Sequence, residues 1–431
     1  CTDDASVQAV GGNERAGRMS PQNLLSTTIT DELRLSNVFQ SKVIAISLKD
    51  RASILPGGHL ANAAYWMDDS NGVFMTSTYY MKSLPGWVEQ FNAEQQAKKL
   101  MANEWNLTMP LEAYRESTPD NTPYEGRWLG EAQSIFPHKT SVLKPSEIKK
   151  TPFGNSILMA FAKRAIQEEK LGQGHVCDFL SISCSSTDYI GHQFGPDAIE
   201  TEDTYLRLDE EIASLLDFLD QQIGEGNYTL FLSADHGVAH NPMYLKDHQV
   251  PAGVWNGNAW KDTINNWLNK QYHSTRLVRL IDNNAIWLNH QVADSLQVNL
   301  TTLRDEVTHW MEKQQAVQGV LSADHIGQCF WPQPLADMMR NGYQASRCGD
   351  VLFVLKPGWL ETAYTTGTTH GTWNPYDTHI PMVWFGWGIR KGVTHRMVSV
   401  TDIAPTLASL LHIQMPNACT GHCMEDVLLQ N

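Results

Sequence analysis

The sequence lacks three features, and each absence excludes a class of protein. It has no run of about eighteen apolar residues, so no segment is predicted to cross a membrane as a helix. Basic residues are scarce, since 32 Lys and Arg stand against 47 Asp and Glu and give a net charge of −15. A surface of that sign repels phosphate backbones, so we expect no nucleic-acid partner. The seven cysteines contain no C-x-x-C motif, which argues against a thiolate zinc site.

The cysteines that are present form two close pairs. Cys329 and Cys348 flank a Trp-Pro-Gln-Pro loop, and Cys419 and Cys423 lie four residues apart near the end of the chain. As disulfides, both pairs suit a periplasmic or secreted protein, which is the location we expect. The alternative is a cytosolic protein with scattered free thiols.

The pattern of apolar residues predicts an α/β fold. Short, nearly continuous apolar runs alternate with longer helical periodicities, which is typical of a mostly parallel sheet flanked by helices on both faces. The predicted strands are 43–48, 72–78, 178–183, 228–233, 351–355 and 381–386. The predicted helices are 84–101, 156–170, 201–222, 303–313 and 402–411. We expect one domain over residues 1–431, with cap insertions at about 103–150 and 241–300 that do not follow the alternation.

Carboxylates and histidines lie close to three of the predicted strands. Asp188 and His192 follow strand 178–183, Asp235 and His236 follow strand 228–233, and His370 lies in a Thr-rich loop shortly before strand 381–386. In open α/β sheets, functional residues gather beyond the carboxyl ends of the strands. We therefore expect these five side chains to lie together.

The types and spacing of these residues indicate a metal centre. A spacing of four lets Asp188 and His192 point at one ion from a single turn of helix or a tight loop. The adjacent Asp235 and His236 are predicted to point to opposite sides of an extended chain, where they can reach two ions. Carboxylate oxygen and imidazole nitrogen suit zinc. Taken singly, each motif has an ordinary interpretation as a helix-surface pair, a turn or an isolated histidine, whereas their combination favours a metal centre.

In combination, the motifs resemble a known family. They are S-T-D-Y-I-G-H-Q-F-G-P around Asp188, S-A-D-H-G around Asp235, and T-T-H-G around His370. This set is similar to that of the alkaline phosphatase superfamily, most closely its nucleotide pyrophosphatase/phosphodiesterase-like branch, which includes single-chain bacterial alkaline phosphatases with a Thr nucleophile. The resemblance extends from residues 16–21 to residues 401–406, which is nearly the whole chain.

The resemblance implies two zinc ions. Asp188, His192 and His370 would hold one ion, and Asp235 and His236 would hold the other together with a further Asp. It also implies in-line displacement at phosphorus by a Thr or Ser, followed by hydrolysis of the phospho-enzyme, while the two ions neutralise the attacking and leaving oxygens.

Two basic residues complete the resemblance. Lys49 and Arg51 follow strand 43–48 and resemble the pair that contacts the non-bridging oxygens of a phosphoryl group in phosphatases. A monoester dianion has such oxygens to spare, and Arg can bind two of them. The alternative is that both residues belong to a solvated turn beside Asp50.

The nucleophile and the sixth zinc ligand of the family have no counterpart before Lys49. In the family, a zinc-binding Asp ends the first strand and the nucleophile follows an early strand in a Thr-Gly-x-x-Pro type of turn, whereas residues 1–42 contain no apolar strand that ends in Asp. We expect that an N-terminal portion of the domain is missing, in preference to a lipoprotein start at Cys1. We also expect the chain by itself to be inactive.

These observations predict a zinc-dependent alkaline phosphatase that is exported, monomeric and active on small phosphate monoesters, with inorganic phosphate as a further ligand. Two alternatives stay open: a phosphodiesterase or nucleotide pyrophosphatase of the same branch, and an inactive fragment that binds metal or phosphate. A sulfatase is disfavoured because no Cys-x-Pro-x-Arg or Ser-x-Pro-x-Arg segment occurs. A phosphoglycerate mutase is disfavoured because that family uses manganese and a different ligand order.

Overall fold

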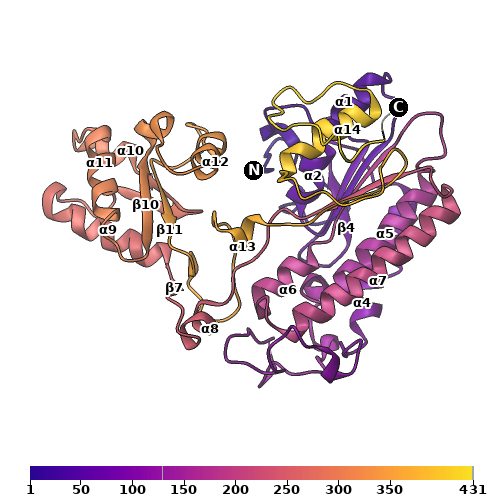
Figure 1. The fold of residues 1–431 in the computed structure, drawn as a ribbon, viewed down its shortest axis with the longest axis horizontal. Coiled ribbons are helices and arrows are strands. Elements are labelled where there is room, and N and C mark those ends of the chain that lie inside the picture. The colour runs from indigo at the N-terminus through magenta and orange to yellow at the C-terminus, as the bar shows by residue number, and fades with distance from the viewer. Residues whose placement is uncertain (129, 430–431) are drawn as a thin grey trace.

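Two lobes make up the molecule and meet beside α8 and α13 (Figure 1). The computed structural model describes residues 1–128 and 130–429. The first lobe is built on a five-stranded sheet in the order β1-β4-β3-β2-β5. Its strands are β1 (Ala9–Val10), β2 (Val43–Ser47), β3 (Ala63–Met67), β4 (Phe74–Ser77) and β5 (Phe179–Ser183). The strands β3, β2 and β5 are parallel, whereas β4 pairs antiparallel with both β3 and β1. The predicted α/β class is confirmed, with a sheet that is parallel in the region nearest the candidate site.

Helices cover both faces of this sheet. The long helices α5 and α7 lie on one side, and α1, α2 and α14 lie on the other (Figure 1). The helices of this lobe are α1 (Ile29–Ser36), α2 (Asp50–Gly57), α3 (Gly86–Ala93), α4 (Gln96–Met101), α5 (Phe153–Glu168), α6 (Ser186–Phe194), α7 (Ile199–Gln222) and α14 (Ile403–Leu411). The helix predicted over 84–101 is divided into α3 and α4 because Gln95 adopts a positive φ of 52°. Both β3 and α2 were absent from the prediction, and α2 ends in a Pro-Gly-Gly run that is atypical of a helix.

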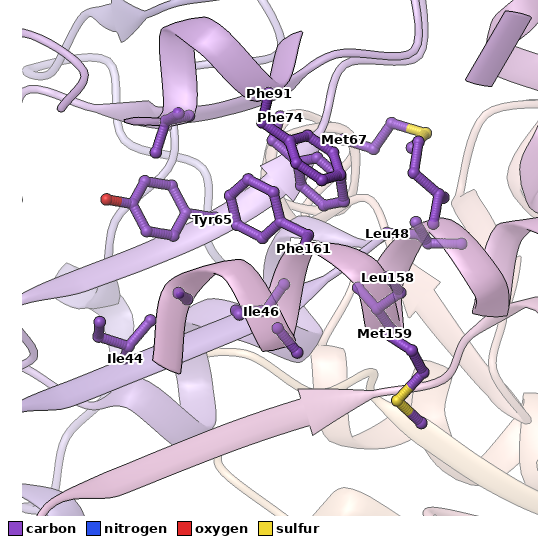
Figure 2. Close-up of a cluster of buried hydrophobic side chains, with 14 of the residues drawn as sticks. Ile44, Ile46, Leu48, Tyr65, Met67, Phe74, Phe91, Leu158, Met159 and Phe161 are labelled. Carbon is purple, nitrogen blue, oxygen red and sulfur yellow. The ribbon is translucent and has the colours of Figure 1, made fainter. Parts of the chain in front are cut away.

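The main core lies between the sheet and α5. Ile46 of β2, Tyr65 of β3 and Phe74 of β4 are buried against Phe161 of α5 (Figure 2). The rings of Phe74 and Phe161 stack with their centroids 4.0 Å apart. Burying a side chain such as Phe161 contributes about 1.5–3 kcal/mol, so this layer fixes α5 against the strands.

A pair of strands lies next to β5. The strand β6 (Thr229–Ser233) pairs antiparallel with β13 (Met382–Gly386) over five residues. The Phe179 ring of β5 and the Phe231 ring of β6 have centroids 6.4 Å apart, so the two strands lie near each other although they are not hydrogen-bonded to one another. Asp188 and His192 follow β5, Asp235 and His236 follow β6, and His370 precedes β13.

The second lobe has its own sheet and core. Its four strands have the order β10-β11-β9-β8. Its elements are β7 (Gly253–Val254), α9 (Gly257–Tyr272), β8 (Val278–Asp282), β9 (Ala285–Leu288), α10 (His290–Ser295), α11 (Leu300–Met311), β10 (Val317–Ser322), α12 (Leu335–Gly342), β11 (Val351–Leu355) and β12 (Trp359–Leu360). The strands β7 and β12 pair in parallel where the chain enters and leaves the lobe. The predicted insertion 241–300 therefore extends to about residue 360, because strand 351–355 pairs with β9 and β10 and not with the main sheet.

In the segment 103–150, leaving residue 129 aside, the helices are short 3₁₀ helices: η2 (Leu111–Ala113), η3 (Thr140–Val142) and η4 (Pro145–Lys150). All seven cysteines are free, so the two predicted disulfides are not formed. Cys329 is buried among the side chains of α12, whereas the thiol of Cys348 donates to the carbonyl of Gly342. Across the described part of the chain, no helix is both long and apolar enough to span a membrane.

Candidate metal centre

The first two predicted ligands lie on one helix. Asp188 is in the first turn of α6 and His192 is in its last turn. A spacing of four residues places both side chains on the same face of the helix. The sequence predicted either one turn of helix or a tight loop for this motif, and the structure shows a helix.

Three imidazole nitrogens converge on one carboxylate oxygen. The Nε2 atoms of His192, His370 and His236 lie 3.3, 3.5 and 3.6 Å from Oδ1 of Asp188. The ligand atoms of Asp188, His192 and His370 all lie within 4.8 Å of one another. Ligand atoms at 2.0–2.1 Å from a tetrahedral zinc ion are about 3.3 Å apart, so the distances from Asp188 to His192 and to His370 fit one such ion.

The charges in this cluster suit a cation. Burial opposes ionisation of Asp188, but the hydrogen bond and the charge of Lys49 outweigh it and hold the pKa of Asp188 below its usual value. Burial, followed by repulsion from His236, lowers the pKa of His370 to about 4. The rings of His236 and His370 are stacked, with centroids 3.3 Å apart. A neutral His370 keeps the lone pair that a metal ion requires.

Asp235 lies at the rim of the cluster. Its side chain is 87% exposed, and its Oδ1 lies 3.6 Å from Nε2 of His236. His236 thus lies between Asp235 and Asp188. The opposite directions predicted for Asp235 and His236 are not observed, because the backbone bends at Asp235 and is no longer extended.

Lys49 lies at the edge of the cluster and contacts Asp188 directly. Its Nζ donates to Oδ2 of Asp188 and lies 4.7 Å from the ring centroid of Tyr189. A second lysine, Lys149, lies 5.0 Å from the same ring. Arg51 is exposed, yet its charge acts on the Tyr189 phenol, whose pKa is raised to about 12 mainly by burial. Lys49 and Arg51 are therefore both near Tyr189, which follows Asp188 in the chain.

The loop that carries His370 is tied to the other two motifs. Nδ1 of His192 lies 3.0 Å from the carbonyl oxygen of Thr368, and this hydrogen bond leaves its Nε2 for the centre. Farther along the loop, the amide of Thr372 donates to Oδ2 of Asp377 at 2.7 Å. The amide of Gly237 donates to the carbonyl of Asp377 at 2.7 Å. Hydrogen bonds of this kind fix the rings and backbone that present ligands to a metal.

The structure thus brings together all five predicted metal ligands with Lys49, and it places Arg51 nearby. Sequence reasoning missed Tyr189, Asn241 and Asp377. Tyr189 could have been noticed as the neighbour of Asp188 within the motif. Asn241 donates to the carbonyl of Gly367, and the carbonyl of Asp377 accepts from the amide of Gly237, so each makes a contact with a residue far away in the sequence that no local signal identifies.

The chain is similar to several known proteins over most of its length. A family model described as type I phosphodiesterase / nucleotide pyrophosphatase matches residues 19–378. A protein of Myroides odoratus named calcium-transporting ATPase is 45% identical over 437 residues, which are 100% of this chain and 80% of that protein. Alkaline phosphatase PhoV of Synechococcus elongatus is 43% identical and covers 99% of this chain and 78% of its own length.

A solved structure is similar to the whole of this chain. The crystal structure of wild-type alkaline phosphatase PafA matches with a TM-score of 0.96 and 41% sequence identity, covering 100% of this chain and 83% of that chain. The chain therefore spans about four-fifths of the length of these relatives.

Proposed function

This chain belongs to the type I phosphodiesterase / nucleotide pyrophosphatase family, and we propose that it is an alkaline phosphatase that hydrolyses phosphate monoesters. The family resemblance predicted from the motifs is confirmed. The observation that carries the proposal is the position of Lys49, which contacts Asp188, the carboxylate on which the three imidazoles converge, while Arg51 lies nearby. A monoester dianion has more charge and more free oxygens than a diester, so two cations beside the centre favour the monoester.

We propose that the centre holds zinc. Asp188, His192 and His370 would hold one ion, and Asp235 and His236 would contribute to a second. The oxygen and nitrogen donors and their separations fit zinc. When bound, zinc would act as a Lewis acid toward phosphoryl oxygens.

The side chains of the chain itself would bind and orient the substrate. Lys49 would donate charge-assisted hydrogen bonds to a phosphoryl oxygen, and the Tyr189 ring beneath its ammonium group limits the positions that this group can take. Arg51 has no hydrogen-bonding partner for its guanidinium among the described residues, so it is free to bind two further oxygens.

Two free strand edges support the prediction that a further segment contributes to the centre. Within residues 1–128 and 130–429, β5 pairs with β2 alone and β6 pairs with β13 alone. A strand placed between β5 and β6, parallel to β5, would end beside Asp188 and Asp235. We propose that the nucleophilic Thr and the sixth ligand reach the centre on such a segment, and that this chain by itself does not turn over monoesters.

The proposal includes the remaining expectations from the sequence. We propose a periplasmic or secreted monomer whose ligands are small phosphate esters and inorganic phosphate. The net charge of −15 supports the absence of nucleic-acid binding. The proposal of export depends on the family resemblance alone, because the cysteines are free and no disulfide supports it.

Binding measurements on the purified 431-residue chain test the proposal. The zinc-loaded protein should bind inorganic phosphate at least tenfold more tightly than dimethyl phosphate, which carries a single charge. A preference for dimethyl phosphate would support the phosphodiesterase instead, and failure to bind either compound would contradict both assignments. Turnover of p-nitrophenyl phosphate by this chain would show that the nucleophile is already present, and would leave the monoesterase assignment intact.

A further inference from the structure

Asn241 is a buried side chain that connects three segments near the centre. It is 3% exposed. Its Oδ1 accepts from the amides of Met243 at 2.7 Å and Tyr244 at 3.2 Å, which caps α8 (Pro242–Asp247). Its Nδ2 donates to the carbonyls of Gly367 at 2.6 Å and Thr365 at 3.1 Å. It also lies 3.4 Å from a third carbonyl, that of Tyr124.

The His370 loop depends on such contacts because residues 361–374 belong to no helix or strand. The Oγ1 of Thr368 donates to the carbonyl of Ala239 at 2.7 Å, close to Asn241 in the chain. The amide of Thr368 donates to the carbonyl of His192 at 3.1 Å. The loop is thus held from one side by residues 239–241 and from the other by the end of α6.

These contacts determine where two of the predicted ligands lie. His370 follows Thr368 by two residues, and the carbonyl of Thr368 accepts from Nδ1 of His192. A displacement at Gly367 would therefore move His370 and release the ring of His192. We propose that Asn241 is a positioning residue of the metal centre, which holds the His370 loop so that His192 and His370 face one ion. This inference rests on the proposed function, because it assumes that the centre binds metal.

The side chain has to be an amide for this role. Since Oδ1 is occupied by the helix cap, the amide has one orientation, and only Nδ2 can face the carbonyls. Asp at this position would keep the cap but would place an anionic oxygen against the carbonyl oxygens of Gly367 and Thr365. Ser would also keep the cap, but its side chain is too short to reach the loop.

Zinc affinity tests the proposal directly. Asn241→Asp and Asn241→Ser are measured by competition with a chromophoric chelator, alongside Asn299→Asp as the control. Asn299 caps α11 in the second lobe by accepting from the amide of Thr302 at 3.0 Å. We expect the Asn241 variants to bind zinc 10- to 100-fold more weakly, the range seen when groups behind metal ligands are removed, and the control to change less than twofold. The Ser variant keeps the test decisive if the Asp variant fails to fold.

A double-mutant cycle with His370→Ala separates positioning from general stability. If Asn241 acts through the loop, Asn241→Ser should weaken zinc binding several-fold less in a protein that already lacks the His370 imidazole than in wild type, because only the part of its effect that passes through His192 remains. The absorption bands of bound cobalt should also change in Asn241→Ser toward those of His370→Ala. Equal losses with and without His370, or an unchanged cobalt spectrum, would overturn the inference. If the wild-type protein binds no zinc, the proposed function itself fails. If it binds zinc but the Asn241 variants bind equally well, only the positioning role fails, so the two failures are distinguishable.

Discussion

Replacing Lys49 with Met should affect zinc and phosphate in opposite directions. Lys49 is mostly buried and is hydrogen-bonded to Asp188, the carboxylate on which three imidazoles converge. A metal ion at this centre must share Asp188 with the lysine. Removing the lysine therefore removes a competing cation, whereas an incoming phosphate loses a cationic hydrogen-bond donor.

The magnitudes follow from the bond that is lost. A hydrogen bond between charged groups contributes about 1.5–3 kcal/mol. If about half of that is given up when metal binds, Lys49→Met should bind zinc about 4- to 13-fold more tightly. Phosphate loses the full contribution, so its dissociation constant should rise about 10- to 150-fold. The metal-free variant should also be less stable by about 1–3 kcal/mol, because the Asp188 charge keeps its burial and loses its partner.

Chelator competition for zinc and calorimetric titration of phosphate measure both effects at pH 8. Lys149→Met is the matched control, because Lys149 lies 5.0 Å from the same Tyr189 ring but pairs with Asp69 and not with Asp188. The control should leave zinc affinity unchanged. Weaker zinc binding in Lys49→Met would refute the reasoning, since it would mean that the lysine supports the metal centre and does not compete with the ion.

Three further outcomes are expected. Arg51→Ala should weaken phosphate binding to the zinc-loaded chain at least tenfold and leave dimethyl phosphate within twofold, and equal losses for both ligands would count against a dianion site. Burial, followed by a neighbouring carboxylate, raises the pKa of Glu125 to about 7, so the folded protein holds this proton more tightly than the unfolded chain, and the associated stability is lost as the pH rises toward 7. Glu125→Gln should accordingly increase the free energy of unfolding at pH 9 by on the order of 1–3 kcal/mol, seen as a higher melting temperature, and leave it unchanged at pH 4. An increase of the same size at both pH values would exclude titration of Glu125 as the cause. Gly367 has a φ of +66°, and a Cβ there would lie 2.1 Å from the carbonyl oxygen of His192, so Gly367→Ala should lower the free energy of unfolding by about 2–3 kcal/mol and weaken zinc binding. Gly226 has a φ of +76° but open space around it, so Gly226→Ala should lower the free energy of unfolding by about 1 kcal/mol and leave zinc binding unchanged. Similar losses of zinc affinity in both variants would show that backbone strain alone is responsible.

The sequence predicted elements well where a single local pattern determines them. The strand predicted over 43–48 is β2 (Val43–Ser47), and its nearly continuous apolar run reflects burial at all five positions. Strand 351–355 was also placed correctly, but its sheet was not, because pairing depends on residues far away in the chain. The helix predicted over 84–101 failed at Gln95, whose left-handed backbone has no signature in the apolar pattern.

The candidate site shows the same division. Metal-ligand chemistry is concentrated in short motifs, so Asp188, His192 and His370 could be predicted to meet. Asn241 carries no such signature: its role depends on contacts with residues more than 100 positions away on either side. The competition between Lys49 and a cation for Asp188 also requires coordinates, since the two residues are 139 positions apart.

The parallel pairing of β7 with β12 has a consequence for how the metal centre is assembled. The amide of Gly253 donates to the carbonyl of Gly358, and the amide of Trp255 donates to that of Leu360, so the second lobe is attached through one narrow neck. The His370 loop lies beyond this neck, whereas Asp188 and His236 precede it. The intervening lobe therefore separates the His370 loop from the other ligands in the sequence, and the pairing of β7 with β12 brings the two sides of that separation back together. Assembly of the complete ligand set thus depends on a part of the molecule that contributes none of the five predicted ligands.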